Sequence, residues 1–85
     1  MTRLWAGGEA ITVWGSDETP AGFAWRGGAH RIDRVCTRWR VHTWWWEPSR
    51  AVCREYLKVV TEDGVLCQLY HDQHSGQWFL ARLYD

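Results

Sequence analysis

The sequence contains a single lysine, two prolines, one methionine and no long run of apolar residues. A membrane-spanning helix needs about 20 consecutive apolar residues, and no run in this chain approaches that length. The N-terminal segment also lacks the apolar stretch of a secretory signal. We therefore expect a cytoplasmic protein that does not contact a membrane, folded as a single domain over residues 1–85 with its ordered core at about residues 10–85.

Paired cysteines are also missing, because Cys36, Cys53 and Cys67 are widely spaced and odd in number. This pattern is typical of reduced thiols that serve as small apolar side chains. Structural zinc sites usually show closely spaced ligand pairs in both halves of the site, and here only His71 and His74 form such a pair. We therefore expect no cofactor, and the weaker alternative is a zinc site built from Cys67, His71 and His74.

Catalytic motifs are absent in the same way. The chain has no nucleophile elbow, P-loop, dinucleotide fingerprint or metalloprotease motif. Its adjacent carboxylates fall in segments with the composition of turns, where the solvated role is the ordinary one. The sequence therefore predicts a protein that is not an enzyme.

No segment sustains helical periodicity, and glycines and short polar clusters separate short runs rich in β-forming residues. The predicted strands are residues 10–14, 21–26, a long run from His30, 54–61, a run ending near Tyr70, and 77–84. Gly27-Gly28 and Asp63-Gly64 are predicted two-residue hairpin turns, the second of type I′. That second turn pairs Val60 with Cys67, Lys58 with Leu69, and Leu57 with Tyr70.

The long third run alternates strictly from Val35 onward but slips once after Ile32. A β-bulge near Asp33-Arg34 would place Ile32 on the apolar face with Val35, Thr37, Trp39, Val41, Thr43 and Trp45. A short helix over residues 32–39 is the alternative, and Pro48 allows one helical turn near residues 47–53. On the strand register, the opposite face carries Arg38, Arg40, His42, Trp44 and Trp46.

The C-terminal hairpins are apolar on both faces, which a flat sheet with one face in water does not accommodate. A small, strongly curved antiparallel sheet or half-barrel of five to six strands buries both faces. We therefore predict an all-β fold of that kind.

Tryptophan and arginine are the abundant residues, with eight tryptophans in the chain and seven arginines within residues 26–54. Burial of Trp25, Trp39, Trp45 and Trp78 would supply a core, which leaves a surplus of rings beside the arginines. Stacking rings with arginines are typical both of hot spots in protein interfaces and of single-strand nucleic-acid sites. The predicted binding residues are Arg26, Arg38, Arg40, His42, Trp44 and Trp46.

The order of the motifs resembles a known family. The pattern runs from Phe23-Ala24-Trp25-Arg26-Gly27 through Arg38-Trp39-Arg40, Trp44-Trp45 and Thr61-Glu62-Asp63-Gly64 to Trp78-Phe79-Leu80 and a terminal Tyr84-Asp85. It is similar to short uncharacterised bacterial domains related to the C-terminal segment of ImuB-type proteins, which are polymerase homologues regarded as non-catalytic and which act in translesion synthesis.

The resemblance implies a non-catalytic adaptor near the DNA-repair or replication machinery. We expect an interaction module that binds a protein partner through its arginine- and tryptophan-rich surface. The alternative is binding of single-stranded DNA by aromatic stacking on the same surface. An exposed aromatic strand also allows a homodimer.

Overall fold

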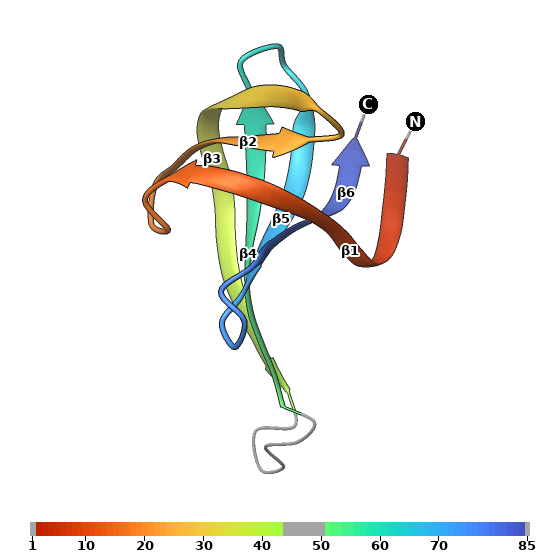
Figure 1. Cartoon of the computed structure of the whole chain (residues 1–85), viewed down its shortest axis with the longest axis vertical. Helices are drawn as coiled ribbons and strands as arrows, with labels where there is room; N and C mark the ends of the chain where they lie inside the picture. Colours follow the sequence, from red (N-terminus) through yellow and green to blue (C-terminus); the bar gives the residue numbers. More distant parts are fainter. Residues whose placement is uncertain (1, 44–50, 85) are drawn as a thin grey trace.

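The structure is a computed structural model that describes residues 2–43 and 51–84, with the side chains described from Gly8 onward. Six antiparallel strands form a closed barrel in the order β1 to β6 (Figure 1). They are β1 Thr2–Gly15, β2 Pro20–Trp25, β3 Gly28–Thr43, β4 Val52–Thr61, β5 Leu66–Asp72 and β6 Trp78–Tyr84. In Figure 1, β1 and β2 run across the front of the view, roughly perpendicular to β3, β4 and β5.

The predicted all-β fold is therefore confirmed, in a form that closes fully. Residues 32–39 belong to β3, so the helical alternative for them is wrong. The suggested helical turn falls partly outside the described residues, and its described end is already strand from Val52. Within the described residues no helix is present that could cross a membrane.

Alternate residues of the C-terminal strands fill the barrel. Leu57 and Val59 of β4 face Leu69 and Cys67 of β5, and Leu80 of β6 completes the layer. Leu57, Val59, Leu69 and Leu80 have no solvent-exposed area. Burial of each such side chain contributes about 1.5–3 kcal/mol of hydrophobic stabilisation. The core thus lies between these strands and the N-terminal hairpin, which adds Phe23.

The turn between β2 and β3 lies one residue earlier than predicted. Trp25 pairs with Gly28, so the two-residue loop is Arg26-Gly27 and not Gly27-Gly28. Both loop residues have positive φ, 49° and 79°, as a type I′ turn requires. The second position is a glycine, which adopts this conformation without steric cost.

The turn between β4 and β5 has three loop residues and not the predicted two. Val59, and not Val60, pairs with Cys67, and Tyr56 pairs with Tyr70. Thr61 sets this geometry, because its hydroxyl donates to the Asp63 carboxylate (2.5 Å) and accepts from the Val65 amide (3.0 Å). A one-residue change of register moves every side chain of a strand to the other face, so the predicted facing pairs are wrong.

β3 contains two irregularities where one was predicted. The first lies between Ile32 and Arg34, as expected, and keeps Ile32 and Val35 on the inner face. The second lies between Val35 and Thr37 and reverses the faces of everything that follows. Trp39, opposite Tyr56, is therefore outside the barrel, which corrects the prediction that its alternating series faces the core.

Candidate functional site

Among the residues that the structure describes, one edge of β3 has no strand partner over most of its length. β2 pairs with β3 only from Gly28 to Arg31, whereas β4 pairs with it from Ile32 to Thr43. Within the described part of the chain, no strand occupies the other edge of β3 beyond residue 32. In Figure 1 the ends of β3 and β4 that flank residues 44–50 extend together beyond the other strands. We call these ends of β3 and β4 the β3–β4 ribbon. It contains the predicted binding residues Arg38, Arg40 and His42.

The second bulge puts Arg38 and Arg40 on the inner face of β3. Arg38 lies opposite the buried Leu57, and Arg40 lies opposite Glu55. Both guanidinium groups contact Glu55, Arg38 Nη1 at 3.7 Å from Oε1 and Arg40 Nη2 at 3.4 Å from Oε2. Arg38 also donates through Nη2 to the backbone carbonyl of Glu18 in the β1–β2 turn. Arg38 therefore joins the ribbon to the first hairpin.

A polar cleft of about 520 Å³ opens between the β1–β2 turn and the β3–β4 ribbon. Its lining comprises Asp17, Glu18, Thr19, Arg38, Arg40, Glu55, His71 and Gln73. Ligand sites commonly have volumes of about 300–1,000 Å³, so this cleft is large enough to hold a ligand group. Two arginines face three carboxylates in it, and the cleft as a whole is therefore not an anion site.

The ring of His71 is fixed at the floor of this cleft. It stacks on Trp78 with centroids 4.5 Å apart and planes 7° from parallel. Its Nε2 lies 3.2 Å from the Gly76 carbonyl oxygen, and its Nδ1 lies 3.2 Å from the Gln73 side-chain nitrogen. Both ring nitrogens are thus engaged with protein atoms.

The other predicted binding residues are placed differently. Arg26 makes a bidentate ion pair with Glu9 (3.1 and 3.2 Å) and lies over the Trp25 ring at 4.9 Å. Hydrogen bonds from Arg26 and then Trp25 hold the pKa of Glu9 below its usual range. Arg26 does not line the cleft. His42 is exposed on the ribbon opposite Cys53.

The predicted binding residues Trp44 and Trp46 lie outside the described residues, as does the predicted core ring of Trp45.

The weak zinc alternative does not correspond to a cluster. Cys67 is buried in the core, with its thiol 4.0 Å from the Val65 carbonyl oxygen. His71 is held as described above, and His74 is exposed in the β5–β6 turn. Within the described residues no group of three histidine, cysteine or acidic side chains is positioned to hold a metal.

The outer face of the barrel carries a row of rings that the sequence did not reveal. Trp39 stacks on Tyr56 with centroids 5.4 Å apart and planes 7° from parallel. The row continues through Tyr70 at 5.3 Å and Phe79 at a further 4.9 Å, where Gly8 of β1 lies against both rings and Tyr70 is buried. Arg54 lies over the Tyr70 ring at 4.5 Å and donates to the Tyr56 hydroxyl, which raises the pKa of Arg54. The sequence analysis missed this row because it used the wrong register for the β4–β5 hairpin. The observed register pairs Tyr56 with Tyr70.

A second group of cations and a ring lies on the same outer face. Tyr84 has Lys58 Nζ at 5.4 Å and the Arg82 guanidinium carbon at 5.7 Å from its ring centroid. Arg82 also donates to the Tyr84 hydroxyl at 3.2 Å. We use the name aromatic face for Trp39, Arg54, Tyr56, Lys58, Arg82 and Tyr84.

A family model described as a domain of unknown function, DUF6504, matches residues 5–85. Neither the curated proteins nor the solved structures contain a match to this chain. The family description names no activity, so the arrangement of residues is the basis for a functional conclusion.

Proposed function

The chain belongs to the DUF6504 family of domains of unknown function, and from its geometry we propose that it is a non-catalytic interaction module that binds an extended peptide along the free edge of β3. The observation that carries this proposal is the edge of β3 between Thr37 and Thr43, which no described strand pairs with. Addition of a strand to such an edge satisfies backbone groups of both chains, and the flanking side chains select the sequence.

The edge is suited to this role because its last seven residue pairs with β4 are regular. Proteins usually protect exposed edges with bulges, prolines or inward-pointing charges. The bulges of β3 end at Thr37, and residues 37–43 contain no proline. Arg38 and Arg40 do face inward, but both guanidinium groups are paired with Glu55, and Arg38 also donates to the Glu18 carbonyl.

The side chains beside the edge define the peptide. Cross-strand neighbours of opposite charge stabilise a sheet by roughly 0.2–1 kcal/mol per pair, and aromatic or β-branched neighbours contribute similarly. Arg38 and Arg40 lie on the inner face and favour acidic residues at alternate positions of the peptide. Trp39 and Val41 lie on the outer face and favour apolar residues between them. The expected ligand therefore alternates acidic and apolar residues.

The charges beside the edge favour this peptide over other ligands of the same edge. A second copy of β3 would bring arginines next to arginines, because Arg31, Arg34, Arg38 and Arg40 face only one acid, Asp33, within the strand. A nucleic acid in the cleft would carry a charge on every nucleotide beside Asp17, Glu18 and Glu55, whereas the peptide carries its charges only at alternate positions, next to Arg38 and Arg40. The resemblance to ImuB-type C-terminal segments is our reason to search first among DNA-repair and replication proteins for the partner.

The test is calorimetric titration with a synthetic peptide that alternates glutamate and valine. Arg40 is the residue to change, because its side chain is 63% exposed and its replacement leaves the core intact. Arg40→Glu should weaken binding by about ten-fold, which corresponds to about 1.4 kcal/mol. Arg31→Glu is the matched control, since Arg31 lies where β2 already pairs with β3, and its affinity should be unchanged.

A peptide that alternates lysine and valine should prefer the Arg40→Glu variant over the parent protein. Equal affinity of the two proteins for both peptides, or no binding of either peptide, would contradict the proposal.

Single-stranded nucleic acid is a second candidate ligand, for the aromatic face and not for the β3 edge. The observation that favours it is the presence of three cations, Arg54, Lys58 and Arg82, among the outer rings. Stacking of a base on such a ring contributes about 1–3 kcal/mol. Titration with a single-stranded oligonucleotide at two salt concentrations tests it, because the affinity should fall steeply with salt. Arg54→Ala should weaken that binding, whereas Arg40→Ala should not.

A further inference from the structure

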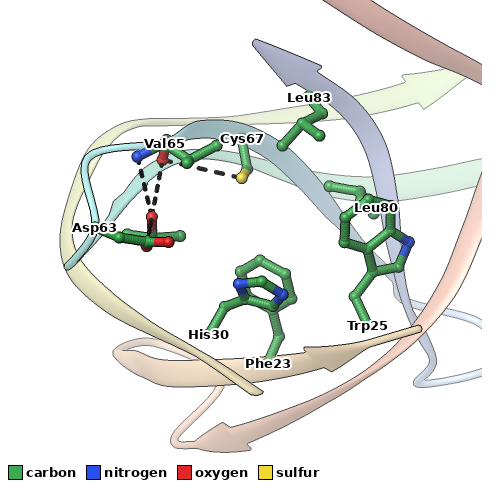
Figure 2. A pocket seen from close by; sticks show the side chains of 9 residues that line it. Phe23, Trp25, His30, Asp63, Val65, Cys67, Leu80 and Leu83 are labelled. Carbon is green, nitrogen blue, oxygen red and sulfur yellow. Dashed lines mark hydrogen bonds between the residues drawn. The ribbon is translucent and has the colours of Figure 1, made fainter. Parts of the chain in front are cut away.

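A small cavity lies beside the β4–β5 turn (Figure 2). The polar cleft lies at the other end of β3, β4 and β5. The cavity has a volume of about 140 Å³. Phe23 and Trp25 of β2 with His30 of β3 form one wall, and the apolar side chains of Cys67, Leu80 and Leu83 form the other. The β4–β5 turn closes one side of the cavity. The proposed peptide site does not use this region.

The polar atoms of the β4–β5 turn beside the cavity already have partners. The Thr61 hydroxyl donates to Asp63 Oδ1 and accepts from the Val65 amide, and the Cys67 thiol points toward the Val65 carbonyl oxygen (Figure 2). The hydrogen bond from Thr61 lowers the pKa of Asp63, so this rim carboxylate is ionised at neutral pH. A buried water needs about two to four polar partners, and apart from the ring nitrogens of His30 and Trp25 the inner lining is apolar.

The size and the walls of the cavity indicate one kind of ligand. An apolar protein cavity of about 150 Å³ remains dry and holds a benzene-sized molecule. The ring of His30 stacks on Phe23 with centroids 5.2 Å apart, and the Trp25 ring lies 6.1 Å from His30. Aromatic rings favour contact with other rings in offset or edge-to-face geometry.

We propose that this cavity binds a single neutral aromatic ring, supplied either by a small molecule or by an aromatic side chain of a partner. The ring would lie between Phe23 and Leu83, against Cys67 and Leu80. A charged ring is disfavoured, because the inner walls would desolvate it without a partner for its charge.

The first experiment is titration of the isotope-labelled protein with benzene, followed by amide chemical shifts. Binding on the order of 1 mM is expected, which is within the per-atom limits for a ligand of this size. Shifts should be concentrated at residues that line the cavity, such as Phe23, Cys67 and Leu83, and be small at Arg40 in the cleft.

Val65→Phe fills the cavity from the β4–β5 turn and should weaken benzene binding at least about ten-fold, or 1.4 kcal/mol. Val60→Phe is the matched control, because Val60 does not line the cavity, and its affinity should equal that of the parent. If Val65→Phe does not fold, Val65→Met is the smaller substitution with the same expected effect.

A blocked phenylalanine amide distinguishes the two sources of the ring. Saturation by this compound with shifts at the same residues identifies a side chain as an accepted source, whereas binding of benzene alone limits the site to free small molecules. No cavity shifts with either compound, or equal benzene affinity in the Val65→Phe variant, would overturn the proposal. A failed peptide titration would not affect it, since the β3 edge and the cavity share no residue.

Discussion

Replacement of Trp39 by alanine tests the reversed faces of β3. The ring is half-buried on the outer side, and its described ring partner is Tyr56, at 5.4 Å. Loss of an aromatic pair costs about 0.5–1.5 kcal/mol, and loss of the remaining partial burial costs a similar amount, giving about 2 kcal/mol. Trp78 is the matched control, because it is 7% exposed and belongs to the core cluster. Trp78→Ala should therefore cost about 3–5 kcal/mol.

Urea unfolding followed by circular dichroism measures both changes, and the slope of the transition shows whether the two variants unfold in the same manner. In a domain of this size, 1 kcal/mol shifts the melting temperature by about 4–8 °C, so the two variants should be clearly separated. Equal destabilisation by the two substitutions would show that Trp39 is a core residue. The assignment of Trp39 to the outer side of the β3 edge would then be wrong.

Three further predictions test other parts of the structure. Thiol labelling of the folded protein should modify the exposed Cys36 readily and leave Cys67 unreacted, because burial raises the pKa of the Cys67 thiol to about 11. The raised pKa of Cys67 also predicts a pH dependence of stability, because the unfolded chain loses the thiol proton first. Its contribution to stability is fully present below the thiol's ordinary pKa of about 9 and falls as pH rises toward 11. In urea titrations the Cys67→Ala variant should lack that part of the pH dependence. Gly8→Ala should destabilise the protein by about 2–4 kcal/mol in thermal melts, because φ of Gly8 is +81° and the added methyl would lie 2.8 Å from Phe79 and Tyr70. Gly28→Ala should be close to neutral, because the atom nearest to its added methyl is 3.4 Å away.

The sequence predicts most strands well because their signals are local, but β1 begins at Thr2 and was predicted only from Ala10. Alternation and turn residues locate the six strands approximately. Apolar residues on both faces of the last strands indicate a curved sheet that buries both faces. A bulge signal is weaker, because a bulge adds a single residue to the pattern. The slip after Ile32 is visible in the order of apolar residues, whereas the irregularity between Val35 and Thr37 leaves the later alternation intact and changes only its phase.

Turn length was the second limit on prediction. Asp63-Gly64 suits a two-residue type I′ turn, yet the loop has three residues because Thr61 bonds to Asp63 and Val65 through its side chain. Only the folded arrangement shows that this competing set of hydrogen bonds is available.

The sequence predicted which strand carries the candidate site, but not which residues its arginines pair with. Arg38 and Arg40 were identified from composition, and the structure brings them together on Glu55. Arg26 was grouped with them by charge alone, and it instead pairs with Glu9 of β1. The free edge itself has no sequence signal, because it depends on β2 ending its pairing at Arg31.

The most direct test of strand addition at the β3 edge compares two N-methylated forms of the glutamate–valine peptide. One form carries methyl groups on the amides of its odd-numbered residues, and the other on the amides of its even-numbered residues. An added strand directs every second amide toward its neighbour, so methylation in one phase removes the shared hydrogen bonds and in the other phase leaves them intact. We predict that only one of the two peptides loses affinity for the protein. Equal affinity of both peptides would contradict pairing of the peptide with the edge of β3.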